Sequence, residues 1–145
     1  MNESKNTRPL WYVIASGLFF VWNLFGLVVF VLAVTVFRDR EALEDAGLNE
    51  QQVELTLATP AWVNVAFATA VIFGVLGCLA LLIKSKRAVP MLIISLVGVL
   101  AQNTYMYFLS DTVQVMGVGA SPMVIVGAIA LIPFALYGAK QGWLR

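Results

Sequence analysis

The sequence predicts an all-α membrane protein: a bundle of four transmembrane helices with a short, partly helical external loop after the first helix. The composition is 61% hydrophobic and 12% charged, whereas soluble proteins average about 25% charged residues. Four long apolar runs carry no charged side chain, and a proline stands at or near the start of each run. A run of about 20 residues crosses the hydrocarbon core of a bilayer, where a helix satisfies its own backbone hydrogen bonds.

The expected spans are residues 10–37, 60–83, 90–110 and 121–139, all within a single domain that covers residues 1–145. The first run, from Leu10 to Phe37, is much longer than the apolar core of a signal peptide, which has about 7–15 residues. No Ala-x-Ala motif ends this run, so we expect a retained helix. At about 1.5 Å per residue, that helix is about 42 Å long and should tilt or project beyond the hydrocarbon core.

The connection between the first two spans, residues 38–59, is acidic and carries helix-capping signals. Gly47 can end one short helix, and Asn49 can cap a second, with Gln52 three residues later completing a capping-box pattern. We therefore expect short helices in this connection. Two roles stay open for it: a lid or partner-docking segment, or a capped connector whose acidic side chains are solvated.

Small residues and one proline predict features of helix packing. Ala66, Ala70, Gly74 and Cys78 recur at every fourth position of the second span. Small residues at this spacing let two helix backbones approach closely. Pro133 lies inside the fourth span, where it removes one backbone hydrogen bond and should bend the helix.

The distribution of lysine and arginine predicts the orientation of the chain. Seven of the nine lie in the two tails or in the connection between the second and third spans: Lys5, Arg8, Lys84, Lys86, Arg87, Lys140 and Arg145. Because loops rich in lysine and arginine stay in the cytoplasm, we expect both termini and the 84–87 turn to be cytoplasmic.

Polar and aromatic residues inside the spans form the candidate site: Trp22, Asn23, Asn64, Gln102, Asn103 and Tyr105. With the expected orientation, all of them fall between the membrane midplane and the outward surface. One interpretation is a pocket for a neutral polar molecule or a lipid headgroup. The other is hydrogen bonding from helix to helix, with each bond contributing roughly 0.6–2 kcal/mol.

Several kinds of chemistry are excluded or disfavoured by residues that the sequence lacks. There is no histidine and only one cysteine, Cys78, which excludes histidine-based haem or triad chemistry and an intrachain disulfide. No acidic or basic side chain lies inside a span, although proton-coupled carriers generally keep one there. The net charge of +1 gives no reason to expect nucleic acid. We expect no enzymatic activity, no catalytic residue, no metal and no cofactor.

Several segments together resemble a family of small, uncharacterised four-span bacterial inner-membrane proteins that are sometimes labelled sugar transporters. The segments are residues 22–23, 58–62, 77–82 and 102–105, with Pro90 opening the third span. The resemblance implies four spans in a bacterial inner membrane.

Two functional hypotheses follow. The first is a non-enzymatic inner-membrane protein that acts by binding or assembly, with a membrane-protein partner, with lipid or with a second copy of itself. The second is an oligomeric facilitator or transporter for a small neutral polar solute such as a sugar. Four spans form a narrow bundle, so a solute pathway would need more than one chain.

Overall fold

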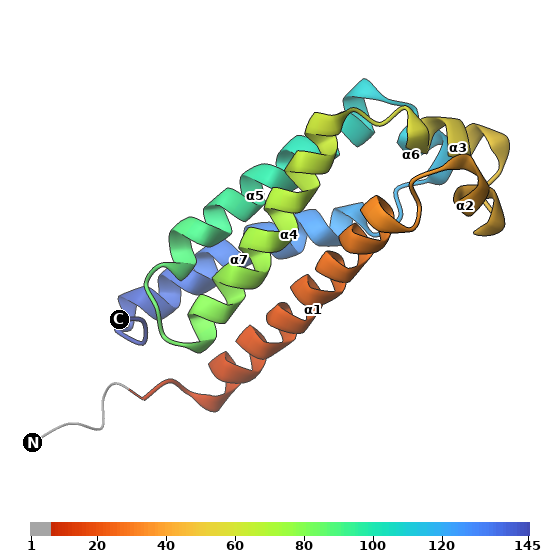
Figure 1. Cartoon of the computed structure of the whole chain (residues 1–145). Helices are drawn as coiled ribbons and strands as arrows, with labels where there is room; N and C mark the ends of the chain where they lie inside the picture. Colours follow the sequence, from red (N-terminus) through yellow and green to blue (C-terminus); the bar gives the residue numbers. More distant parts are fainter. Residues whose placement is uncertain (1–6) are drawn as a thin grey trace, which may run out of the picture.

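The computed structural model describes residues 7–145, and in that range the protein is all-helical, which confirms the predicted fold class (Figure 1). Four helices are long and apolar enough to cross a membrane, so the protein is a multi-pass membrane protein. They are α1 (Leu10–Thr35), α4 (Ala61–Leu82), α5 (Ala88–Thr104) with its continuation η2 (Tyr105–Leu109), and α7 (Ser121–Lys140). These bounds lie close to the four expected spans.

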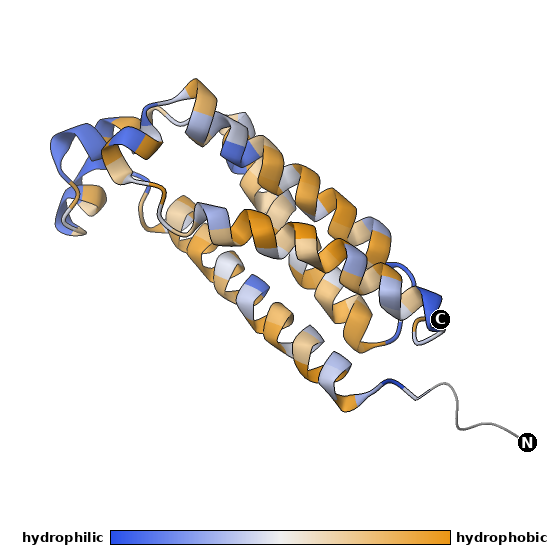
Figure 2. Ribbon diagram, turned by 180° about the vertical axis from the view of Figure 1, so that it is seen from behind, coloured by the Kyte–Doolittle hydropathy of each residue, from blue (hydrophilic) through white to orange (hydrophobic). Residues whose placement is uncertain are grey.

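The two ends of the bundle differ in what they contain (Figure 1). One end, termed here the terminal end, holds the start of α1, the 84–87 turn and the C-terminus. The opposite end, termed the loop end, holds the short helices α2 (Arg40–Asp45), α3 (Glu50–Leu57) and α6 (Thr112–Met116). Figure 2 shows hydrophobic residues along the long helices and the most hydrophilic segments near the two ends. That distribution suits a bundle surrounded by hydrocarbon along its length.

The long helices pack in the order α1–α4–α5–α7. Helix α5 approaches α4 closely at Gly98, because a Cβ atom there would lie 2.7 Å from both the carbonyl oxygen of Ala66 and the amide nitrogen of Ala70. The two backbones are therefore in direct contact. Two small residues of the stripe that the sequence singled out, Ala66 and Ala70, face this glycine.

Helices α1 and α7 meet at the terminal end through aromatic side chains. The ring of Tyr12 stacks on that of Phe134 with a centroid distance of 4.4 Å, and the Tyr12 hydroxyl donates a hydrogen bond to the Phe134 carbonyl at 3.3 Å. Trp143 lies edge-on to Tyr12 at 5.0 Å. This aromatic contact joins the first and last long helices.

The C-terminal residues close the terminal end. Leu144 is almost fully buried. The backbone of the next residue, Arg145, pairs with the 84–87 turn: Lys86 N–H donates to Arg145 O at 3.0 Å, and Arg145 N–H donates to Lys84 O at 2.5 Å. The chain end is thereby tied to the turn between α4 and α5.

Arg8 caps the end of α4 from a distant part of the sequence. Its guanidinium donates hydrogen bonds to the carbonyl oxygens of Leu81 at 2.6 Å and Leu82 at 2.9 Å. The last carbonyls of a helix lack partners within the helix and carry partial negative charge, so a cation satisfies them well. Arg8, two residues before the start of α1, is thus held against the end of α4.

The loop end is a small folded unit, with the short helices that the capping signals predicted. Asn49 and Gln52 form the capping box of α3, and Gly47 ends α2 with a φ of +88°. Leu43 of α2 and Val53 of α3 are buried. The acidic side chains of the connection are exposed, and Arg40 pairs with Glu44 at 3.5 Å within α2. An exposed pair of this kind contributes little to stability.

Two local features concern helix regularity. Pro133 lies on an exposed face of α7, and the helix continues through it. The third span ends in the π-helical turn η2, where the Ser110 hydroxyl donates to the carbonyl of Tyr105 at 3.1 Å. This π-helical turn was not among the predicted features.

Candidate intramembrane binding site

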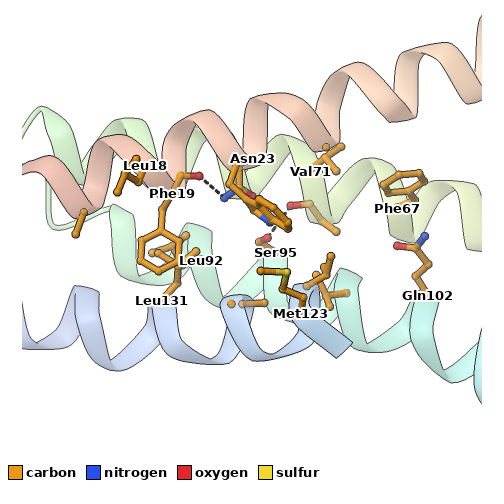
Figure 3. A pocket seen from close by; sticks show the side chains of 18 residues that line it. Leu18, Phe19, Asn23, Phe67, Val71, Leu92, Ser95, Gln102, Met123 and Leu131 are labelled. Carbon is orange, nitrogen blue, oxygen red and sulfur yellow. Dashed lines mark hydrogen bonds between the residues drawn. The ribbon is translucent and has the colours of Figure 1, made fainter. Parts of the chain in front are cut away.

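A cavity of about 410 Å³ lies among the four long helices, and all four contribute to its lining (Figure 3). Its walls include Ala15 to Gly26 of α1, Phe67 to Val71 of α4, Leu92 to Gln102 of α5 and Met123 to Leu131 of α7. The cavity separates α1 from α7 beyond the aromatic contact at the terminal end. We term it the intramembrane cavity.

The intramembrane cavity reaches the surface of the bundle between α1 and α7. Leu18 of α1 is 68% exposed and Met123 of α7 is 65% exposed, yet both line the cavity. Both residues belong to helices that cross the membrane. The opening therefore lies between two helices that are long and apolar enough to cross a membrane.

The lining is mostly apolar, and its few polar groups are placed unevenly. Toward the terminal end it presents Leu18, Phe19, Leu92 and Leu131 (Figure 3). Asn23 and Ser95 lie in the middle, and Gln102 lies toward the loop end beside Phe67 (Figure 3). The cavity thus has an apolar end and an end with one polar side chain.

Asn23 uses its amide hydrogens within the protein. Its Nδ2 donates to the carbonyl of Phe19 at 2.8 Å and approaches the Cys78 Sγ at 3.6 Å. Its Oδ1 lies against the backbone of Gly74, in the space that a Cβ atom there would need. Gly74 therefore makes room for the amide of a neighbouring helix.

Ser95 joins α5 to α4 at the same level. Its hydroxyl donates to the Ala70 carbonyl at 2.6 Å, and its Oγ is 3.2 Å from the position of a Cβ atom on Gly74. Ser95 was not part of the predicted cluster. Its position three residues before Gly98, which faces the small stripe of α4, is the signal that places it on this face.

Gln102 is the lining residue whose side-chain amide is unused as both donor and acceptor, whereas Asn23 leaves only its Oδ1 and Trp22 only its indole N–H without a hydrogen bond among the described residues. Within residues 7–145 its side-chain amide has no hydrogen-bond partner, and the amide points toward Phe67 (Figure 3). A glutamine amide offers two donor hydrogens and one acceptor oxygen. It can therefore bind a polar group that enters the cavity.

The predicted cluster is divided by the structure. Trp22, Asn23 and Gln102 line the intramembrane cavity, whereas three other members lie elsewhere. Asn64 is exposed on α4. Asn103 is 7% exposed; its Nδ2 donates to the Val99 carbonyl at 2.8 Å and its Oδ1 has no partner among the described residues. Tyr105 lies edge-on to Trp62, with a centroid distance of 5.7 Å.

The chemistry of the lining is that of a neutral binding site. No charged side chain lines the intramembrane cavity, and the described residues hold no group of three or more side chains that could bind a metal ion. Fold and site together define a multi-pass membrane protein with an apolar internal cavity. Comparisons of the chain with models of protein families, with curated proteins and with solved structures found no match. The family resemblance therefore stays a prediction, and the geometry of the cavity is the basis for inferring a function.

Proposed function

We propose that this chain is a non-enzymatic membrane protein that takes a largely apolar molecule from the bilayer and binds it in the intramembrane cavity. The observation that carries this proposal is a cavity of about 410 Å³, lined mainly by apolar side chains and open between α1 and α7, two helices long and apolar enough to cross a membrane. Its volume falls within the roughly 300–1,000 Å³ that is usual for ligand sites.

The source of affinity at such a site is packing rather than dehydration. An alkyl chain that moves from lipid into the cavity leaves one apolar environment for another, so the hydrophobic effect contributes little. Contacts with fixed surfaces contribute instead, because each pair of well-packed atoms adds a small dispersion energy. The aromatic rings of Phe19, Trp22 and Phe67 provide such surfaces.

A solute facilitator is less well supported by this lining. A sugar carries many hydroxyl groups, and each needs a hydrogen-bond partner when it leaves water. The Asn23 amide hydrogens and the Ser95 hydroxyl hydrogen are already donated within the protein. Gln102 offers an amide whose donors and acceptor are both unused, which suits a ligand with one polar group better than a sugar.

The proposal includes a bacterial inner membrane with both termini in the cytoplasm. It is supported by the cations of the terminal end, which among the described residues are Arg8, Lys84, Lys86, Arg87, Lys140 and Arg145. Lys5, which the sequence analysis counted with them, lies outside the described residues. The acidic residues of the described chain fall in the loop-end segments, around α2, α3 and the start of α6.

The test uses Trp22 as a reporter, because its indole lines the intramembrane cavity. Bromododecane is added to the full chain in phosphatidylcholine nanodiscs, and tryptophan fluorescence is recorded, since bromine quenches a nearby indole. Binding in the cavity gives a saturable component of quenching that Trp22→Phe removes. The remaining tryptophans report only nonsaturable partitioning into the bilayer.

Two glycine substitutions make a matched pair. A Cβ atom on Gly127 or on Gly17 would meet no atom within 4 Å, but only Gly127 lines the cavity. Gly127→Leu should therefore fill the cavity and abolish saturable quenching, while Gly17→Leu leaves it intact. Equal saturable quenching in both variants would contradict the proposal. A thermal shift with glucose that Gly127→Leu removes would instead favour the facilitator.

A further inference from the structure

We infer that the ligand of the intramembrane cavity is a neutral, single-chain amphiphile whose one hydrogen-bonding group, a hydroxyl, meets Gln102. Its hydrocarbon chain lies toward Leu92 and Leu131. This inference rests on the proposed function and adds the chemical class of the ligand and the direction in which it lies.

The polar end of the ligand is placed by the lining residue whose side-chain donors and acceptor are all unused. Asn23 donates both amide hydrogens within the protein, and Ser95 donates its hydroxyl hydrogen to Ala70. Gln102 makes no such bond within residues 7–145, and its amide faces the cavity beside Phe67 (Figure 3). A hydroxyl can donate to the amide oxygen or accept from an amide hydrogen, so one hydroxyl can pair with this group.

The neutrality of the ligand follows from the surroundings of Gln102. No charged side chain lines the cavity, and burying an ion without a partner in an apolar environment is costly. A carboxylate or ammonium group would therefore stay outside. A hydroxyl needs only the hydrogen bonds that Gln102 offers.

The apolar end and the volume define the rest of the molecule. The part of the lining toward the terminal end consists of hydrocarbon and aromatic surface, with Phe19, Leu92 and Leu131 close together (Figure 3). A volume of about 410 Å³ lies near the lower limit for ligand sites, about 300 Å³. It suits one chain and is too small for a lipid with two long chains and a charged headgroup.

The cavity should bind an alcohol more tightly than an alkane, because only the alcohol gives the Gln102 amide a hydrogen-bond partner. The alkane would leave the amide unpaired in an apolar site, whereas an alcohol of the same length pairs with it. A neutral hydrogen bond of ordinary strength corresponds to a preference of about two- to tenfold. This preference is the measurable signature of Gln102.

The experiment compares bromododecanol, brominated at the chain end remote from the hydroxyl, with bromododecane by saturable quenching of Trp22 in nanodiscs. In the wild type the alcohol should bind about two- to tenfold more tightly, and Gln102→Leu should remove the difference while alkane binding persists. Thr104→Val is the matched control. Thr104 is exposed on the same helix and donates only to the carbonyl of Leu100, so this variant should keep the preference.

The outcomes separate this inference from the proposed function. Saturable binding of both probes with equal affinity, or a preference that Gln102→Leu leaves unchanged, would overturn the role of Gln102 while the cavity remains a binding site. Absence of saturable quenching by either probe would overturn both. A permanently charged bromododecyl trimethylammonium probe that binds as tightly as the alcohol would overturn the neutrality of the ligand.

Discussion

The Oδ1 atom of Asn23 in α1 occupies the space that a side chain at Gly74 of α4 would fill. The glycine therefore does more than let two helices approach. It leaves space for a polar group against its backbone, while the Asn23 amide donates hydrogen bonds to Phe19 O and Cys78 Sγ. This contact fixes α1 to α4 near the middle of the cavity wall.

Gly74→Ala should lower the free energy of unfolding, by about 1–2 kcal/mol, because the new methyl group displaces the Asn23 amide from its hydrogen bonds. Denaturant or thermal unfolding in detergent measures the loss. In the double variant Asn23→Ala/Gly74→Ala the clash is gone, so the two effects should be strongly nonadditive. Simple additivity would mean that the two residues do not meet.

Gly98→Ala should lower the free energy of unfolding more than Gly74→Ala does. The new methyl group meets the backbone of α4 at Ala66 O and Ala70 N, and backbone cannot move aside as a side-chain amide can. A loss of about 2–3 kcal/mol is expected. Gly17→Ala is the control, because its Cβ meets nothing within 4 Å; it should be neutral or slightly stabilising through helix propensity. Equal stability of the Gly98 and Gly17 variants would contradict the α4–α5 contact.

Arg8→Met should destabilise the terminal end by about 1–2 kcal/mol, because two carbonyls at the end of α4 lose a charged donor. Arg8→Lys keeps the charge but cannot reach both carbonyls with the same planar fork. Its stability should therefore fall between that of the wild type and that of Arg8→Met. Lys140→Met, at an exposed position in the last turn of α7, controls for loss of charge. A melting temperature for Arg8→Met equal to that of Lys140→Met would show that the cap contributes nothing.

Reporter fusions test the proposed orientation. A fusion after Arg145 should report a cytoplasmic position, and a fusion within residues 44–50 should report the opposite compartment, because lysine and arginine gather at the terminal end. A cytoplasmic signal from the 44–50 fusion would reverse the orientation while leaving the cavity unchanged.

The sequence predicted the spans well because hydrophobicity and length act locally. The same is true of the Asn49 and Gln52 capping box, whose hydrogen bonds join residues three apart. The terminal-end contacts were not predictable in this way. The bond from Arg8 to Leu81 joins residues 73 positions apart, and no local pattern encodes such a pairing.

The candidate site was predicted in part for a related reason. Depth in the membrane can be read from sequence, and it grouped Asn23, Asn64 and Gln102 at similar levels. The face of the bundle toward which a side chain points depends on tertiary packing. In the structure Asn64 faces outward, while Ser95 faces inward. The cavity itself arises from the separation of α1 and α7, which no single helix determines.

Photolabelling tests the central claim, that the cavity holds an alkyl chain, most directly. A dodecanol with a diazirine at the chain end is photolysed with the full chain in nanodiscs, and the labelled peptides are mapped by mass spectrometry. The account predicts labelling at Phe19, Leu92 or Leu131 that is lost in Gly127→Leu and retained in Gly17→Leu. Labelling confined to outward-facing residues such as Val21 and Phe25, and equal in both variants, would contradict it.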